Sequence, residues 1–155
     1  PSQADLVRKK LMMIKMCMYA SPAYLAANGT PQRLEDMSDH RLICQNTDSN
    51  QVHAGLNLIQ QLMMHDVRSM LTVNNYFGVL QAVLSNVGIG ILPDYVTHDF
   101  PSLVRVLPEV ESTEVPVYLA YPEELRQSKR VSAFKDFVQD EIITYRKQLR
   151  ENEKS

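Results

Sequence analysis

The segment SMLTVNNYFGVLQAVLSNVGIGILP, from Ser69 to Pro93, has the pattern of a strand, a helix and a second strand with short connections. Its first apolar run is of strand length and ends at Asn74-Asn75, a pair typical of turns and helix N-caps. Apolar residues then recur at helical spacing, at Tyr76, Val79, Leu80, Val83, Leu84 and Val87. Asn86 and Gly88 supply a helix stop, and the second apolar run closes at Pro93.

Two buried strands joined by one helix require a parallel crossover connection, so this segment predicts an α/β fold. In such sheets ligands bind beyond the carboxyl ends of the strands and against helix N-termini. Asn74, Asn75 and Tyr76 are therefore candidate ligand contacts. An N-cap at Asn75 and a turn residue at Asn74 explain the pair without a ligand, and the two roles can coexist.

Size and composition predict one ordered globular chain. Its 155 residues are long enough to bury a core, and 45% apolar with 22% charged residues is ordinary for such a domain. A net charge of −2 argues against a dedicated nucleic-acid surface, which carries a basic excess. Cys17 and Cys44 lie in apolar runs and predict buried thiols in a reducing, cytoplasmic compartment. No apolar run reaches the ~20 residues that span a membrane.

The other patterns predict further elements along the chain. Strands are expected at Leu11–Ala20, Arg41–Gln45, Leu103–Leu107 and Val115–Tyr121. Short helices are expected at Ala23–Asn28 after a cap at Ser21, at Leu34–Met37 after a cap at Thr30, and at Pro93–Val96. Weak alternation over Leu56–Gln60 and Gln61–Met64, with His65-Asp66 as the turn, predicts an antiparallel hairpin that leads into Arg68–Val73, following a loop at Asn46–Gly55. Ser128 is expected to cap a long helix with an apolar stripe at Val131, Phe134, Val138, Ile142, Tyr145 and Leu149.

Patterns typical of catalysis are missing from the sequence. No two of the four histidines are three or four residues apart, so a helical zinc pair is absent. Gly88-Ile89-Gly90 precedes a strand and lacks a third glycine, which favours close packing of strand against helix over cofactor binding. We therefore expect no catalytic residue, no metal and no cofactor, although a site assembled in space from distant residues stays possible.

Three segments resemble the effector-binding domain of LysR-type transcriptional regulators. They are CMYASPAYLAANGTPQRLEDMSDHRLI (Cys17–Ile43), VNNYFGVLQAVLSNVGIGILPDYV (Val73–Val96), and LVRVLP, VPVYLAYP and RVSAFKDFV within Leu103–Val138. The resemblance covers roughly Val7 to Asp140 and keeps the order of the motifs. It implies a fold similar to type 2 periplasmic binding proteins, in which two α/β lobes are joined by two crossing strands and a small effector occupies the cleft between them.

The resemblance also implies a division of the chain. Residues 1–20 would be a crossing strand and a remnant of lobe I, 21–114 the complete effector-binding lobe II, 115–149 the return strand and C-terminal helix of lobe I, and 150–155 a disordered tail. The family's effector contacts would fall at Asn74, Asn75, Tyr76, Phe77, Leu92 and Pro93, with Ser21 at the hinge.

The family places a winged helix-turn-helix and the rest of lobe I before the position of Pro1. We therefore expect a partial first lobe, DNA contact only through the absent winged helix, and exposed apolar residues such as Val131, Phe134 and Val138 that favour a homodimer or higher oligomer. The leading interpretation is a cytoplasmic sensor of a small, anionic metabolite. An exported solute-binding protein is the first alternative. A small α/β enzyme is the second, and it would show a displaced pKa beside Asn74.

Overall fold

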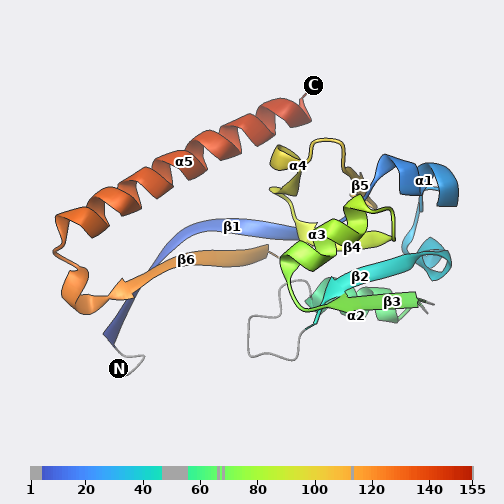
Figure 1. Cartoon of the computed structure of the whole chain (residues 1–155), viewed down its shortest axis with the longest axis horizontal. Coiled ribbons are helices and arrows are strands. Elements are labelled where there is room, and N and C mark those ends of the chain that lie inside the picture. Colours follow the sequence, from blue (N-terminus) through green and yellow to red (C-terminus); the bar gives the residue numbers. More distant parts are fainter. Residues whose placement is uncertain (1–4, 47–55, 66, 68, 113, 155) are drawn as a thin grey trace. The chain divides into compact units, whose positions relative to one another are not determined.

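The chain forms two compact units. The structure, a computed structural model, describes residues 5–46, 56–65, 67, 69–112 and 114–154. Unit 1 comprises Pro1–Ile14 with Pro116–Ser155, and unit 2 comprises Lys15–Val115. The strands β1 (Leu6–Ala20) and β6 (Glu114–Pro122) each contain one of the two points at which the chain passes between the units (Figure 1).

Unit 2 is built on a mixed sheet. Its strand order is β3-β2-β4-β1-β5, with β2 at Arg41–Gln45, β3 at Ser69–Val73, β4 at Ile89–Pro93 and β5 at Val104–Val106. β2 runs parallel to both β3 and β4, whereas β1 runs antiparallel to β4 and β5. The parallel arrangement predicted for the two strands of the Ser69–Pro93 segment is confirmed, with β2 inserted between them.

Helices cover both faces of this sheet, because successive strand side chains point to opposite faces. On β2, Leu42 and Cys44 belong to a core that includes Leu58 and Leu62 of α2 (Leu56–Met63). Ile43 belongs to a second core, formed with α3 (Tyr76–Leu84) and α4 (Val96–Asp99). α1 (Pro22–Asn28) contributes Tyr24 and Leu25 to the same core as α2. Unit 2 is therefore a three-layer α/β/α structure.

The two glycines before and within β4 serve close packing, as the sequence predicts. A Cβ atom at Gly90 would lie 3.0 Å from Val79 Cγ1 and closer still to Val83 Cγ2, both on α3. At Gly88 it would collide with the backbone carbonyl oxygen of Arg41 on β2. Only residues without a side chain let the α3–β4 connection approach the sheet this closely. Cys17 and Cys44 are buried free thiols, also as predicted.

Two local predictions are wrong. The hairpin expected at Leu56–Met64 is the helix α2, because Leu58 and Leu62, one turn apart, both enter the core. The second short helix, η2 (Leu34–Asp39), is a 3₁₀ helix that begins after Arg33 rather than after Thr30. The Asp36 side chain holds this start by accepting hydrogen bonds from the backbone N–H groups of Gln32 (2.8 Å) and Arg33 (3.2 Å).

Smaller differences concern element boundaries. The short helix expected at Pro93–Val96 is displaced to α4, which begins at Val96. Most of the loop expected at Asn46–Gly55 lies outside the described residues.

Unit 1 contains the first part of β1, most of β6, a 3₁₀ turn η3 (Glu123–Leu125) and the long helix α5 (Lys129–Glu153). β6 pairs with β1, and Arg146 Nη2 of α5 donates to the Met13 carbonyl oxygen (3.3 Å). Ser128 caps α5 as predicted, its Oγ accepting from Val131 N (3.4 Å). Because α5 runs to Glu153, most of the tail expected to be disordered is helical.

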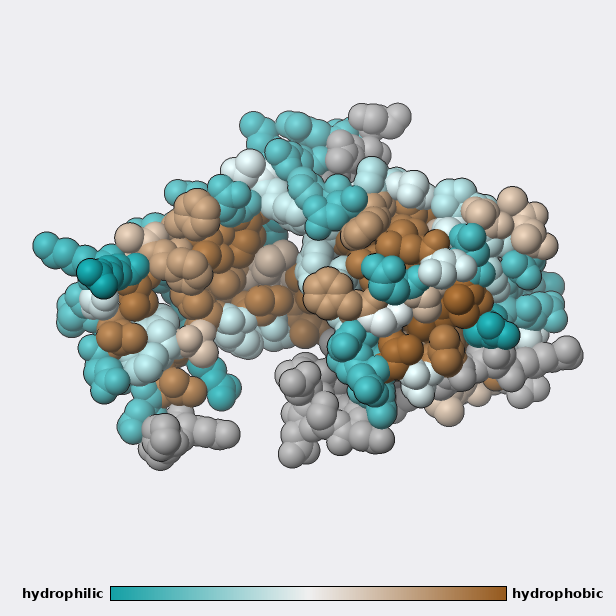
Figure 2. Space-filling model, in the orientation of Figure 1, coloured by the Kyte–Doolittle hydropathy of each residue, from teal (hydrophilic) through white to brown (hydrophobic). Residues whose placement is uncertain are grey.

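The apolar stripe of α5 is only partly covered. Val131, Val138, Ile142 and Tyr145 are half-buried, whereas Phe134 is 56% and Phe137 61% exposed. Figure 2 shows hydrophobic side chains reaching the surface over the region of α5 and β6. Across the described residues, no helix combines the length and apolarity that a membrane crossing requires.

Candidate functional site

The carboxyl ends of β2, β3 and β4 meet at one edge of the unit 2 sheet. Gln45 lies opposite Val73, and the pairing of Leu42 with Ile89, continued at the same offset, brings Gln45 level with Leu92. From β2 the chain moves outward to β3 through α2, and from β3 it returns across β2 to β4 through α3 on the opposite face. The adjacent ends of β2 and β4 are thus a topological switch point, where open α/β sheets bind ligands.

The N-terminus of α3 opens beside this switch point. Asn75 is its N-cap, with extended backbone (φ −153°, ψ 168°) and a side-chain oxygen that accepts from Gly78 N at 2.9 Å. Asn74 is exposed, and its carbonyl oxygen accepts from Gln45 Nε2 (3.5 Å). Asn46 N donates to the Val73 carbonyl oxygen (2.7 Å), which extends the pairing of β2 with β3. The predicted capping role of Asn75 is confirmed.

Aromatic rings gather at the same edge. Phe77 is 70% exposed and packs edge-on against Tyr76, with ring centroids 5.6 Å apart. Tyr76 also faces Tyr95, which follows β4, at 6.5 Å. Burial raises the pKa of both tyrosines, so each hydroxyl stays protonated and available as a donor over the physiological range.

Charged groups of both signs flank β4 where it ends. Burial raises the pKa of Asp94, and the positive charges of Lys15 and Arg105 only partly oppose this effect. The Asp94 backbone N–H donates to the Lys15 carbonyl oxygen (2.8 Å), which holds the segment after β4 against β1. Lys15 Nζ lies 4.0 Å from Glu114 Oε1, with both side chains about half exposed. In this ion pair the charges remain largely solvated.

Ser21 lies elsewhere. β1 is antiparallel to β4, with Met16 opposite Pro93 and Tyr19 opposite Gly90, so Ser21 follows β1 at the amino end of β4. About 13 Å of strand separates the two ends of β4, at ~3.3 Å per residue. Ser21 Oγ accepts from Tyr24 N (3.1 Å) and donates to Asn86 Oδ1 (2.6 Å). The expectation that Ser21 sits at the hinge is wrong, because the chain passes between units at Ile14–Lys15.

The structure therefore brings together six of the seven predicted site residues: Asn74, Asn75, Tyr76, Phe77, Leu92 and Pro93. Of these, Leu92 is fully buried in the core, so its side chain packs beneath this edge and is not exposed on its surface. Three further residues belong to the same edge but are not among the predicted site residues: Gln45, Asp94 and Tyr95. Gln45 ends a predicted strand just as Val73 does, so the same argument could have found it. Within the described part of the chain, no three His, Cys, Asp or Glu side chains lie close enough to hold a metal ion.

Unit 2 has a doubly wound sheet with a switch point flanked by amide and aromatic side chains, and the antiparallel strand β1 extends this sheet. This is the architecture of a periplasmic-binding-protein-like domain. The chain belongs to the LysR substrate-binding domain family, whose model matches residues 1–142. The predicted fold class and family are thereby confirmed.

Two curated relatives are helix-turn-helix transcriptional regulators. One from Haemophilus influenzae is 27% identical over 122 residues, which cover 77% of this chain and 42% of the relative. YhjC from Escherichia coli is 29% identical over 138 residues, covering 83% of this chain and 45% of that protein. The chain thus spans less than half the length of these relatives.

Among solved structures, the regulatory domain of CrgA, a LysR-type transcriptional regulator from Neisseria meningitidis, superposes with a TM-score of 0.72 at 20% identity. The match covers 91% of this chain and 71% of the CrgA domain. At this identity the likeness supports the fold.

Proposed function

We propose that the chain is the effector-sensing part of a LysR-type transcriptional regulator, and that unit 2 is its effector-binding lobe II. A small anionic metabolite binds at the carboxyl edge of β2, β3 and β4. One observation carries this assignment: the capped N-terminus of α3 opens beside the switch point of the sheet. Membership of the LysR substrate-binding family supports it.

The chemistry of this edge favours an anion. The first turn of a helix has backbone N–H groups without intrahelical partners and a positive dipole end. Asn75 Oδ1 occupies Gly78 N, which leaves the N–H groups of Tyr76 and Phe77 directed toward a ligand. Asn74 adds a side-chain amide from an exposed position. The positive charges of Lys15 and Arg105 act in the same region, since both lower the pKa of Asp94.

The organic part of the metabolite packs on the rings of Tyr76 and Phe77. Phe77 is largely exposed, and a large apolar ring in that position becomes favourable when a ligand removes it from water. Burying a phenyl ring contributes roughly 2 kcal/mol to binding. This contact and the helix N-terminus together favour an aromatic or aliphatic carboxylate over an inorganic anion.

In the intact regulator, effector binding would shift the balance between conformations of the sensing domain. DNA contact would come from a winged helix outside residues 1–155, and the regulator would act in the cytoplasm as a homodimer or higher oligomer. The curated relatives, described as helix-turn-helix regulators, support this view.

The test is a thermal-shift screen of the intact regulator against a library of carboxylate metabolites. A ligand at 100 times its Kd should stabilise the folded protein by about 2.7 kcal/mol. Phe77→Ala should reduce this stabilisation to about 1 kcal/mol and Asn74→Ala should also reduce it, while Phe137→Ala, on α5 and similarly exposed, should retain it in full. A library without a single stabilising compound, or a hit whose stabilisation neither site variant reduces, would contradict the proposal.

The enzyme alternative has one observation in its favour, the raised pKa of Asp94. Burial explains that shift, however, and the described residues of this edge hold no nucleophile paired with a base. Incubating each stabilising compound with the protein and analysing it by mass spectrometry separates the two functions. Turnover that Asp94→Asn removes would favour an enzyme. A signal peptide in the intact gene product would instead favour the exported binding protein.

A further inference from the structure

Unit 2 has a second concavity, at the edge of the sheet opposite the proposed effector site. Its volume is about 390 Å³, and its walls come from α1, η2, the start of β2 and the α3–β4 turn. This volume falls within the range of small-molecule sites. The resemblance and the switch-point argument both concern the carboxyl edge, so neither assigns a role to this concavity, which we call the amino-edge pocket.

Two contacts hold the walls of the amino-edge pocket in place. Ser21 Oγ donates to Asn86 Oδ1 (2.6 Å), which ties the start of α1 to the α3–β4 turn. Gly88 lies directly against the Arg41 backbone and so fixes the turn to β2. A pocket whose walls are already fixed loses little conformational entropy when it binds a ligand.

A chain of hydrogen bonds determines which nitrogen of the buried His40 ring carries the proton. The Tyr24 hydroxyl and His40 Nδ1 lie 2.8 Å apart. Burial raises the pKa of Tyr24, although a hydrogen bond from the Arg41 backbone opposes this effect, so the hydroxyl stays protonated. Because the hydroxyl oxygen accepts from the Arg41 backbone, the hydroxyl proton is donated to His40 Nδ1. Burial also lowers the pKa of His40, so the neutral ring carries its own proton on Nε2.

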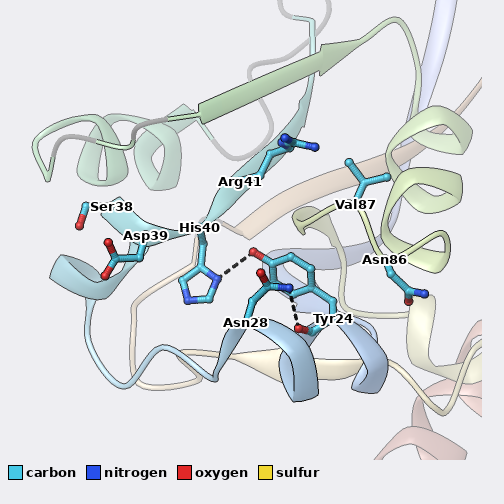
Figure 3. A pocket seen from close by; sticks show the side chains of 8 residues that line it. All are labelled: Tyr24, Asn28, Ser38, Asp39, His40, Arg41, Asn86 and Val87. Carbon is cyan, nitrogen blue, oxygen red and sulfur yellow. Dashed lines mark hydrogen bonds between the residues drawn. The ribbon is translucent and has the colours of Figure 1, made fainter.

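The Nε2–H group of His40 faces the amino-edge pocket. His40 lines this pocket, and among the described residues Nε2 has no hydrogen-bond partner. Over the same residues no fully buried side-chain nitrogen or oxygen lacks a partner, so Nε2 is accessible. Since only 5% of His40 is exposed, that access is through the pocket. Figure 3 shows this nitrogen on the side of the ring away from the Tyr24 hydroxyl.

Hydrogen-bond acceptors lie on the same side of His40. In Figure 3, Ser38 and Asp39 lie on the side of His40 opposite Tyr24. The Asp39 carboxylate acts on His40 through its charge, and no hydrogen bond or ion pair joins these two side chains within the described part of the chain. A donor and an acceptor that face one space without touching suit a group that can accept from the first and donate to the second. A hydroxyl group does both, whereas a carboxylate only accepts and an ammonium group only donates.

The two asparagines of the pocket repeat this combination. Asn28 Nδ2 donates to the Tyr24 carbonyl oxygen (3.0 Å), which leaves Asn28 Oδ1 as an acceptor. Asn86 Oδ1 accepts from Ser21, which leaves Asn86 Nδ2 as a donor. Asn86 lies on the far side of Tyr24 from His40 (Figure 3). A ligand that reaches both His40 and Asn86 therefore needs several hydroxyl groups.

We propose that the amino-edge pocket binds an uncharged polyhydroxylated molecule of monosaccharide size, with one hydroxyl group between His40 Nε2 and the Asp39 carboxylate and another at Asn86. Arg41 takes no part in binding, because its side chain is directed away from the Tyr24–His40 pair and has interactions of its own. The pocket is independent of the proposed effector site, because the two lie at opposite ends of β2 and β4.

The first test needs no ligand. Long-range ¹H–¹⁵N NMR of the histidine rings in the whole chain should show neutral His40 with its proton on Nε2. A proton on Nδ1 would remove the donor on which the proposal depends and would overturn it.

The second test is a ¹H–¹⁵N NMR titration of the whole chain with glucose, galactose and mannose, each compared with its amino-sugar and uronate counterpart. At least one hexose should shift the backbone amides of Asn28, His40 and Val87 saturably, and the amides of Asn74 and Phe77 should not move. That hexose should bind more tightly than its two charged counterparts. The absence of saturable binding by every hexose, or binding of a charged counterpart that is at least as tight, would overturn the proposal.

The third test removes the acceptor. Asp39 is exposed at the end of η2, and Asp39→Ala should weaken binding of the hexose about tenfold, the loss expected for one hydrogen bond to a charged group. Asp99→Ala on α4, also exposed, is the matched control and should leave binding unchanged. Unchanged affinity in Asp39→Ala would refute the assignment even if the unmodified protein binds the hexose.

Discussion

Replacing Gly90 with alanine tests the packing of α3 on the sheet. The added methyl group would point at Val79 and Val83, both fully buried on α3, and would come closer to Val83 Cγ2 than any relaxed contact allows. Gly90 does not have a positive φ, so alanine itself is compatible with the backbone. Any loss of stability therefore reports the collision and not the conformation of the chain.

The expected magnitude follows from two opposing effects. Overpacking a well-packed core costs about 1–3 kcal/mol. Removing a glycine restricts the unfolded chain and returns about 0.4–1 kcal/mol. Gly90→Ala should thus lower the free energy of unfolding by roughly 1–2 kcal/mol. Val83→Ala deletes two buried methyl groups and should cost about 2 kcal/mol by itself.

The decisive measurement is the double variant. In the Val83→Ala background the new methyl group enters space that the Val83 side chain has vacated. The double variant should therefore lose at least ~1 kcal/mol less stability than the sum of the losses in the two single variants. Urea unfolding followed by circular dichroism gives the free energy of unfolding of the whole chain. Hydrogen exchange of the β4 amides reports the stability of unit 2 separately from that of unit 1. Additivity within about 0.5 kcal/mol would refute the claim that the two side chains compete for one space.

Three further predictions concern single side chains of unit 2. Asn75→Ala removes the N-cap of α3 and should lower the urea-derived stability by about 1 kcal/mol, whereas Asn75→Asp should keep most of it; equal losses would contradict the capping role. Ser21→Ala removes both the donor to the exposed Asn86 Oδ1 and the N-cap of α1, and should cost about 1 kcal/mol in the same assay; a neutral effect would contradict both roles. The lowered pKa of His40 means that the unfolded chain binds a proton more readily, so stability should fall as the pH drops below about 6.5. His40→Gln should flatten this pH dependence and His98→Gln should not; a slope that survives in His40→Gln would refute the assignment.

Where the sequence succeeded, local chemistry and tertiary packing favoured the same structure. Asn75 is a good cap that is also followed by a periodic apolar stripe. Gly90 lacks a side chain where β4 touches α3, and Gly88 where the α3–β4 turn touches β2. When local sequence preference and tertiary packing agree in this way, few other structures of the segment are favourable. The grouping of Asn74, Tyr76 and Pro93 at the carboxyl edge could be predicted for the same reason, since parallel strands that end together bring their following residues together; that an effector binds there stays a prediction.

The failures have physical causes. At Leu56–Met64 the weak alternation of apolar and polar residues favours a hairpin, whereas the spacing of Leu58 and Leu62 favours a helix. The helix forms because it buries both leucines in the core. β1 begins at Leu6, within the charged stretch before Leu11, so this strand is longer than its apolar run indicates, and the chain passes between the units inside it, at Ile14–Lys15. The pocket between α1, η2 and the α3–β4 turn joins three segments far apart in the chain, and no local pattern predicts that these segments meet.

Unit 2 is one uninterrupted stretch, and Lys15 and Glu114, at its two ends, are ion-paired. A segment whose two ends lie close together can be expressed alone with its ends joined by a short linker. It can also be inserted into a surface turn of an unrelated protein with little strain. Such a transplant would carry the proposed effector site with it into an unrelated protein.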